Sequence, residues 1–280
     1  LTVCVVPRKG FTRSLAYFVT DYGSVHTDYR FAGKDYRSPA GVAHYLEHKM
    51  FDLPDRDVSA EFARLGASTN AFTSYDMTAY YFSCTKNFDA CLRLLLEFVS
   101  TPYFTAESVE KERGIIDQEI GMNEDAPDSV IFENLVKAMY REHPIRVPIL
   151  GTGETIREIT PEILYDCHRA FYAPGNMLLC VIGDVDPEAV TAAAVREDPA
   201  LAATVVPARE QAPSDVPARA ERAEHPAAAL AARTMLRRRN SVRRTSAAIR
   251  TVLQETVTTR RMLHSSRTSS ARATPYPAYA

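Results

Sequence analysis

The feature that most constrains this chain is the run from Gly41 to Phe51, which contains the pattern His44-x-x-Glu47-His48. The run has the composition of a helix, and residues four apart on a helix lie on one face. His44 and His48 therefore project together, and two neutral imidazoles on one face can bind one metal ion such as zinc. Glu47 can then lie beside a water molecule at that ion and accept its proton. Two partly buried helix histidines without a metal are the alternative that the motif alone leaves open.

A second helical segment, residues 110–120, offers the third ligand that a catalytic zinc site needs. Its isoleucines form an apolar stripe, which is typical of a helix packed on a core. Glu112 and Glu119 are two helical turns apart, so both carboxylates face the same way. One carboxylate can complete a site of two histidines and one glutamate, and the other can orient a ligating histidine from outside the ligand set.

The pattern His44-x-x-Glu47-His48, followed roughly seventy residues later by Glu112-x6-Glu119, resembles the M16 metallopeptidases, the group of pitrilysin, insulinase and the mitochondrial processing peptidase. The resemblance covers about residues 1–195 and is strongest to a bacterial branch, the active-type partner in an operon-paired set of M16-like proteins. Further stretches that agree with the family are Gly66–Ser74, Met77–Tyr80, Tyr140-x-x-His143-Pro144, Gly151-Thr152, and Glu47–Phe51 together with Gly114–Ile120.

The resemblance implies a zinc-dependent metalloendopeptidase in which His44, His48 and Glu119 bind Zn²⁺. It implies that Glu47 is the general base and that Glu112 is a carboxylate outside the ligand set. The implied substrate is a peptide or an unfolded polypeptide, and the implied partner is a second M16-like subunit or domain that closes around it. In the alternative interpretation, a chain without that partner is a non-catalytic peptide-binding subunit or an inactive fragment.

Substrate binding is implied for one strand of a predicted pair, 67–73 and 78–84. The first of these resembles the edge strand that borders the zinc cleft in the family, where a peptide can add as an extra strand. The resemblance therefore implies that Asn70 and Ala71 contact the substrate. The alternative is a polar strand whose asparagine is satisfied within the protein.

Strands and helices mix without a strict alternation, which predicts an α+β domain with a mixed, mainly antiparallel sheet and helices packed on it. We expect strands 2–7 and 14–22 to form the first hairpin around Arg8-Lys9-Gly10, followed by a polar connection to Ser38. Thr105 and Thr160 are expected to cap helices. Beyond the segments already named, the pattern predicts a buried strand at 177–183 and helices at 57–65, 87–99, 105–123, 129–140, 160–171 and from 186 onward.

The charge of the chain changes sign near residue 198, although the formal net charge is only −2. Residues 1–198 carry 19 basic and 30 acidic side chains, a balance of −11, whereas residues 199–280 carry 14 and 5, a balance of +9. The second part is rich in Ala and Arg and has too few large apolar residues to bury a core. We therefore expect a peptidase domain at 1–197 and a tail at 198–280 that is disordered or read out of frame.

The tail contains arginine clusters, which can bind nucleic acid or membrane surfaces. No aromatic residues alternate with them, so we expect no nucleic-acid partner. The five cysteines are widely spaced and never form Cys-x-x-Cys, which favours a reducing compartment. The longest apolar runs are far shorter than the ~20 residues that span a bilayer. We expect a cytoplasmic protein with no membrane span, and because the chain begins with Leu1, we expect its natural start to lie upstream.

Overall fold

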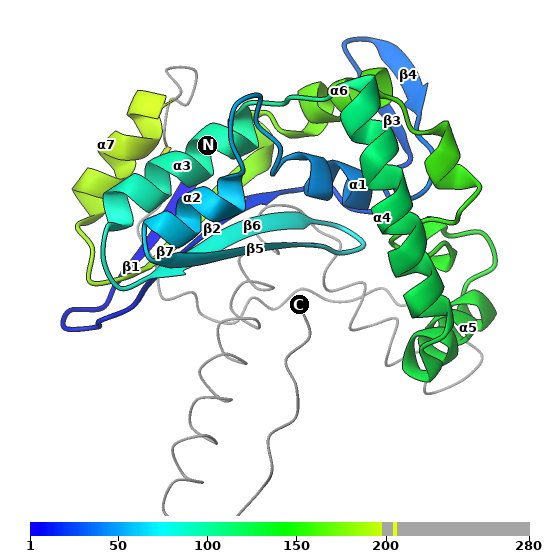
Figure 1. The fold of residues 1–280 in the computed structure, drawn as a ribbon, viewed down its shortest axis with the longest axis horizontal. Helices are drawn as coiled ribbons and strands as arrows, with labels where there is room; N and C mark the ends of the chain where they lie inside the picture. The colour runs from blue at the N-terminus through cyan, green and yellow to red at the C-terminus, as the bar shows by residue number, and fades with distance from the viewer. Residues whose placement is uncertain (198–203, 206–280) are drawn as a thin grey trace, which may run out of the picture. The chain divides into compact units, whose positions relative to one another are not determined.

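The computed structural model describes residues 1–197 and 204–205, and Figure 1 shows helices packed over one face of a sheet. The sheet has six strands in the order β5-β6-β2-β7-β1-β8. The pairs β5-β6, β6-β2 and β2-β7 are antiparallel, whereas β7-β1 and β1-β8 are parallel. The predicted α+β class with a mixed, mainly antiparallel sheet is therefore confirmed. The strands are β1 (Thr2–Pro7), β2 (Ser14–Thr20), β5 (Ala67–Thr73), β6 (Thr78–Cys84), β7 (Met177–Gly183) and β8 (Thr204–Val205).

The first two strands do not form the hairpin that we expected. β7 lies between them, and Cys180 is the register partner of Cys4 in β1 on one side and of Tyr17 in β2 on the other. β7 has the sequence MLLCVIG and is buried at nearly every position. A strand that is apolar on both faces is stabilised most in the middle of a sheet. β7 therefore pairs with both β1 and β2, and these two strands do not pair with each other although they are consecutive in the sequence.

A short hairpin replaces part of the polar connection that we expected before Ser38. It consists of β3 (Asp28–Phe31) and β4 (Lys34–Arg37), joined by two residues with positive φ, Ala32 and Gly33. Such two-residue turns match the twist of paired strands. The strands read DYRF and KDYR, in which Tyr29 and Tyr36 stack with ring centroids 5.2 Å apart. The hairpin was missed because charged residues fill the other face.

Seven α-helices are described, and none of the helices in the described part of the chain is long and apolar enough to cross a membrane. The predicted caps are present: the hydroxyl of Thr105 accepts a hydrogen bond from the amide of Ser108 at 3.1 Å, and that of Thr160 accepts one from Ile163. The helices are α1 (Val42–Lys49), α2 (Val58–Arg64), α3 (Phe88–Ser100), α4 (Ala106–Glu124), α5 (Pro127–Met139), α6 (Pro161–Phe171) and α7 (Pro187–Glu197).

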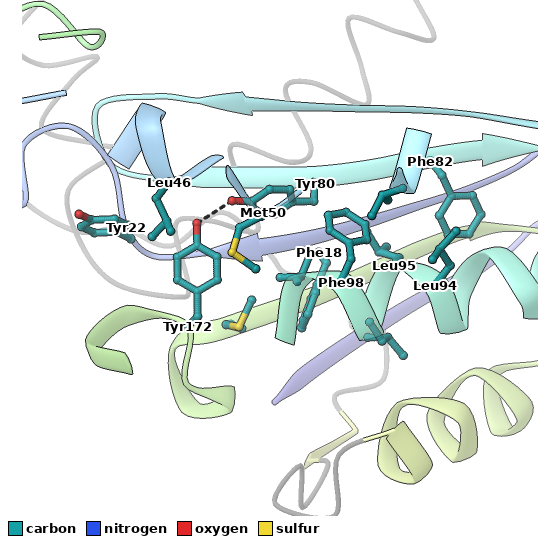
Figure 2. Close-up of a cluster of buried hydrophobic side chains, with 14 of the residues drawn as sticks. Phe18, Tyr22, Leu46, Met50, Tyr80, Phe82, Leu94, Leu95, Phe98 and Tyr172 are labelled. Carbon is teal, nitrogen blue, oxygen red and sulfur yellow. Dashed lines mark hydrogen bonds between the residues drawn. The ribbon is translucent and has the colours of Figure 1, made fainter. Parts of the chain in front are cut away.

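The core lies between the sheet and the helices, as Figure 2 shows for a cluster of its largest side chains. The hydroxyls of Tyr80 and Tyr172 are hydrogen-bonded at 2.7 Å within it. Leu46 on α1 and Met50 directly after it point into the cluster and anchor the helix on the sheet. The labelled residues are Phe18 and Tyr22 from β2 and its end, Tyr80 and Phe82 from β6, Leu46 and Met50 from α1 and its end, Leu94, Leu95 and Phe98 from α3, and Tyr172 after α6.

Candidate metal centre

The start of helix α1 is fixed by a close backbone contact that two glycines permit. A Cβ atom on Gly41 would lie 2.4 Å from the carbonyl oxygen of Leu150, and one on Gly151 would lie 2.5 Å from that of Ala40. Both glycines also have positive φ, 92° and 76°, which side chains disfavour. The two segments can therefore touch only as glycines, and their contact sets where α1 begins.

The structure brings the three predicted ligands together. Helix α4 packs against α1 (Figure 1), and the carboxylate oxygen Oε2 of Glu119 lies 3.6 Å from Nε2 of His44 and 3.6 Å from Nε2 of His48. One ligand atom from each of the three residues lies within 4.8 Å of the other two. Glu119 remains 41% exposed, so the group faces solvent on the α4 side.

The donor set fits zinc. Burial, together with the nearby imidazole of His48, lowers the pKa of His44 to about 3, so His44 is neutral and can offer a lone pair. Its other nitrogen, Nδ1, is buried and has no hydrogen-bond partner among the described residues. Two neutral imidazoles and a carboxylate are the ligands of many catalytic zinc sites.

Glu112 lies where it can orient His48, as we expected. Its oxygen Oε1 is 2.8 Å from Nδ1 of His48, so the N–H at Nδ1 donates to the carboxylate and Nε2 is left to face Glu119. Burial raises the pKa of Glu112, but the hydrogen bond and charge of His48 outweigh burial, and the net pKa is lowered. Burial likewise lowers the pKa of His48, while Glu112 and the nearby carboxylates raise it above its usual range.

Glu47 is buried beside the cluster of ligands. Burial raises its pKa, an effect that a hydrogen bond from Thr73 and the charge of His48 reduce and that Glu119 increases. The hydroxyl of Thr73 donates to Oε2 of Glu47 at 2.7 Å. A carboxylate with a raised pKa holds a proton more readily, which suits a general base.

Asn70 and Ala71 lie on β5, which is an edge strand of the sheet, as the resemblance to the family implied. The side chain of Asn70 is exposed, and its Oδ1 accepts a hydrogen bond from the amide of Ala71 at 2.8 Å. A peptide that pairs with the amide of Ala71 must therefore displace the side chain of Asn70. Substrate binding by these two residues stays a prediction.

Thr73 is the site residue that sequence reasoning missed. It belongs to the stretch that resembles the family, yet nothing in the pattern links it to Glu47, 26 positions earlier. The sequence offered only a weak signal. Side chains alternate between the two faces of a strand, so Thr73, at the end of β5, lies on the same face as Ala71.

Comparisons with known proteins show which family the chain resembles. Residues 32–153 match the family model of insulinase, peptidase family M16, and residues 158–219 match that of the peptidase M16 inactive domain. A Bacillus subtilis protein named uncharacterized zinc protease YmfH is 49% identical over 192 residues, 68% of this chain and 45% of the relative. A Rickettsia felis protein with the name uncharacterized zinc protease is 32% identical over 161 residues, 56% of this chain and 39% of the relative.

Solved structures give the same family. The crystal structure of a protein described as an M16-like peptidase, from Alicyclobacillus acidocaldarius, is 44% identical with a TM-score of 0.69, covering 70% of this chain and 47% of that one. A mutant of the ferredoxin protease FusC in complex with Arabidopsis ferredoxin is 26% identical with a TM-score of 0.59, covering 69% and 22%. This chain spans about half the length of its first relatives, or less. Together, the two family models, the zinc-protease relatives and the solved structures show that the chain belongs to the M16 family of peptidases.

Proposed function

We propose that this chain carries the catalytic centre of a zinc-dependent endopeptidase, with His44, His48 and Glu119 as the zinc ligands and Glu47 as the general base. The observation that supports this most is the convergence of the three ligand atoms within 4.8 Å beside a buried glutamate. The relatives' name, zinc protease, supports the same reaction class.

The reaction divides between the ion and the chain. Zinc, when bound, polarises a peptide carbonyl and lowers the pKa of a water molecule from 15.7 towards ~7. Glu47 accepts the proton of the attacking water and returns it to the leaving amine. Glu112 keeps the N–H of His48 on Nδ1, so that Nε2 stays available as a ligand.

We propose that the substrate is an extended peptide or unfolded polypeptide that adds to β5. The edge of β5 presents main-chain groups next to Thr73 and hence to Glu47. Main-chain pairing recognises an extended shape more than a particular sequence. Asn70, which covers the amide of Ala71, would turn away when the peptide binds.

A second candidate is a subunit that binds peptide but needs a partner for turnover. One observation favours it: the helix pair α4–α5 exposes large apolar side chains. Met122 is 68% exposed and Ile131 is 66% exposed, and a large exposed apolar patch is typical of a surface that binds another protein. A second M16-like domain or subunit would cover such a surface.

The test is zinc content measured beside hydrolysis of an unfolded protein such as reduced, alkylated casein. We expect Glu47→Gln to keep about one zinc per chain while hydrolysis falls by roughly 10²- to 10⁴-fold, the usual contribution of a positioned base. His44→Ala should lose both. His26→Ala is the matched control, since Nδ1 of His26 accepts a hydrogen bond from the amide of Gly23 and the residue is not part of the site. This variant should change neither the zinc content nor the rate of hydrolysis.

Equal zinc loss in Glu47→Gln and His44→Ala would contradict the assigned roles. To separate the two candidates, the same assay is run with and without an M16-like partner chain. Hydrolysis by the chain alone supports the endopeptidase, and hydrolysis only with the partner supports the partner-dependent subunit. Zinc binding without hydrolysis in either case would identify a non-catalytic subunit.

A further inference from the structure

Thr73 makes the one hydrogen bond that Glu47 receives from another side chain in the part of the chain that the structure describes. Its hydroxyl lies 2.7 Å from Oε2 of Glu47 and donates to it, because an ionised carboxylate can only accept. Such a bond to a charged group is shorter and stronger than one between neutral groups. The hydroxyl of Thr73 contacts Oε2 and not Oε1, so the two carboxylate oxygens differ in their surroundings.

The position of Thr73 is set by the opposite strand. Thr73 is the register partner of Thr78 in β6, and their hydroxyl oxygens are 3.4 Å apart. Thr78 is fully buried, and its own hydroxyl donates to the carbonyl of Tyr22 at 2.9 Å. The hydroxyl proton of Thr78 is therefore donated to the carbonyl of Tyr22, and the hydroxyl proton of Thr73 is free to be donated to Glu47.

We infer that Thr73 is a positioning residue for Glu47, which holds Oε2 and leaves Oε1 as the oxygen that exchanges the proton with water. This inference rests on the proposed function. Without the hydroxyl, the glutamate side chain could rotate, and each rotation would move the proton acceptor away from the reacting water. A small displacement of a catalytic group is enough to lower the rate strongly.

The placement of Thr73 also joins the base to the edge strand. Thr73 ends β5, two residues after Ala71, so the strand that is proposed to pair with the peptide is the strand that holds Glu47. A peptide bound along β5 would restrict this strand and the Thr73 side chain with it. The effect of Thr73 should therefore appear in kcat, after the peptide has bound, and not in KM.

The experiment compares Thr73→Val, which keeps the shape but removes the hydroxyl, with Thr73→Ser, which keeps the hydroxyl. We expect Thr73→Val to lower kcat about 10-fold or more, equivalent to about 1.4 kcal/mol in the barrier, with KM and zinc content unchanged. Thr73→Ser should restore most of kcat. Thr20→Val is the matched control: its buried hydroxyl donates to the carbonyl of Phe171, which also accepts from Asn176, and kcat should be unchanged.

A second readout does not depend on activity. Unfolding by urea is measured for Thr73→Val, Glu47→Ala and the double variant, all as full-length chains. We expect Thr73→Val to destabilise the wild-type chain more than the Glu47→Ala chain, because the hydroxyl loses its partner in the latter. Additive effects would show that the two side chains do not interact.

The outcomes separate the inference from the proposed function. A wild-type kcat for Thr73→Val, a kcat for Thr73→Ser as low as that of Thr73→Val, or a change in KM alone would overturn the positioning role. If the wild-type chain itself does not hydrolyse peptide under any condition, the proposed function fails. The unfolding cycle then still decides whether Thr73 holds Glu47.

Discussion

Glu112 illustrates how one residue can control a site without contacting its centre. It is largely buried, with 15% of its side chain exposed, and touches His48 only through Nδ1. By holding the proton there, it selects the tautomer in which Nε2 carries the lone pair. The buried pair also explains why His48 has a raised pKa and Glu112 a lowered one.

We predict that Glu112→Ala weakens zinc binding by about 10- to 100-fold, the usual effect of removing a carboxylate that orients a ligand. Glu112→Gln should be intermediate, since its carbonyl can still accept from Nδ1. The zinc affinity is measured by competition with a chromogenic chelator. Glu110→Ala is the control, because Glu110 is exposed and pairs with Arg113 on the same helix. An unchanged affinity in Glu112→Ala would exclude the orienting role.

Helical spacing predicted which side chains of this site share a face, and the resemblance to the M16 family implied their roles. Two histidines four apart and two glutamates seven apart define faces, and faces can be read without a structure. Thr73 could not be found in this way, since its contact with Glu47 depends on how β5 meets α1. Site residues that depend on a contact between two elements therefore could not be predicted from the sequence.

At the scale of elements, most helices and strands were predictable, but their neighbours were not. β1, β6 and β7 have the predicted bounds, yet β7 comes between β1 and β2. The alternation of apolar and polar residues identifies a strand. Which strands it pairs with depends on whether one or both of its faces must be buried. The β3–β4 hairpin has an aromatic face, but each strand is only four residues long and carries charged residues on the other face, so its alternation was too short to detect.

Helix α1 is tied to α4 by a buried lysine that no pattern singled out. Lys49 is fully buried, and its ammonium group donates to Asp52 and to the carbonyl of Ser108, which lies on α4. A buried ion pair and an apolar replacement of similar volume often have similar stabilities, whereas removal of one partner leaves an uncompensated charge.

We therefore predict that Lys49→Met, which leaves only the half-exposed Asp52 without its partner, changes the free energy of unfolding by less than ~1 kcal/mol. Asp52→Ala, which leaves the charge of the fully buried Lys49 without its partner, should lower it by about 2 kcal/mol. The second figure is moderate because Asp52 is half exposed and water can reach the site. Urea unfolding of the metal-free chain measures both. Asp55→Ala is the control, since Asp55 is exposed and faces Arg56 at the surface. A larger loss in Lys49→Met than in Asp52→Ala would contradict this account of the contact between α1 and α4.

For the whole molecule, composition was a weaker guide than periodicity. The change in charge near residue 198 predicts the end of the domain there, and this boundary stays a prediction. Thr204 and Val205 pair with β1, and the match to the M16 inactive domain continues to residue 219. Charge describes the surface and does not determine where a sheet ends. The remainder of the predicted tail, including its arginine clusters, lies outside the described residues.

The buried His168 should make the stability of the molecule depend on pH. It stacks on Tyr172, and its Nε2 is hydrogen-bonded to the carbonyl of Val99, so it joins α6 to α3. Burial lowers its pKa below the ordinary 6.5, and the Val99 carbonyl offsets only part of the effect. The folded chain thus binds this proton less readily than the unfolded chain does. By linkage, the contribution of neutral His168 to the free energy of unfolding is complete above pH ~6.5. It is lost as the pH falls towards the pKa of His168 in the folded chain.

We predict that the free energy of unfolding falls between pH 7.5 and pH 5, and that it falls less steeply in His168→Gln, which does not titrate. Urea unfolding of both chains at half-unit pH steps, with a chelator present throughout, gives the two slopes. His44 and His48 titrate in both chains, so the difference between the slopes belongs to His168. Parallel slopes would mean that His168 is protonated equally well in the folded and unfolded states, and that its burial between α6 and α3 does not limit the stability of the domain in acid.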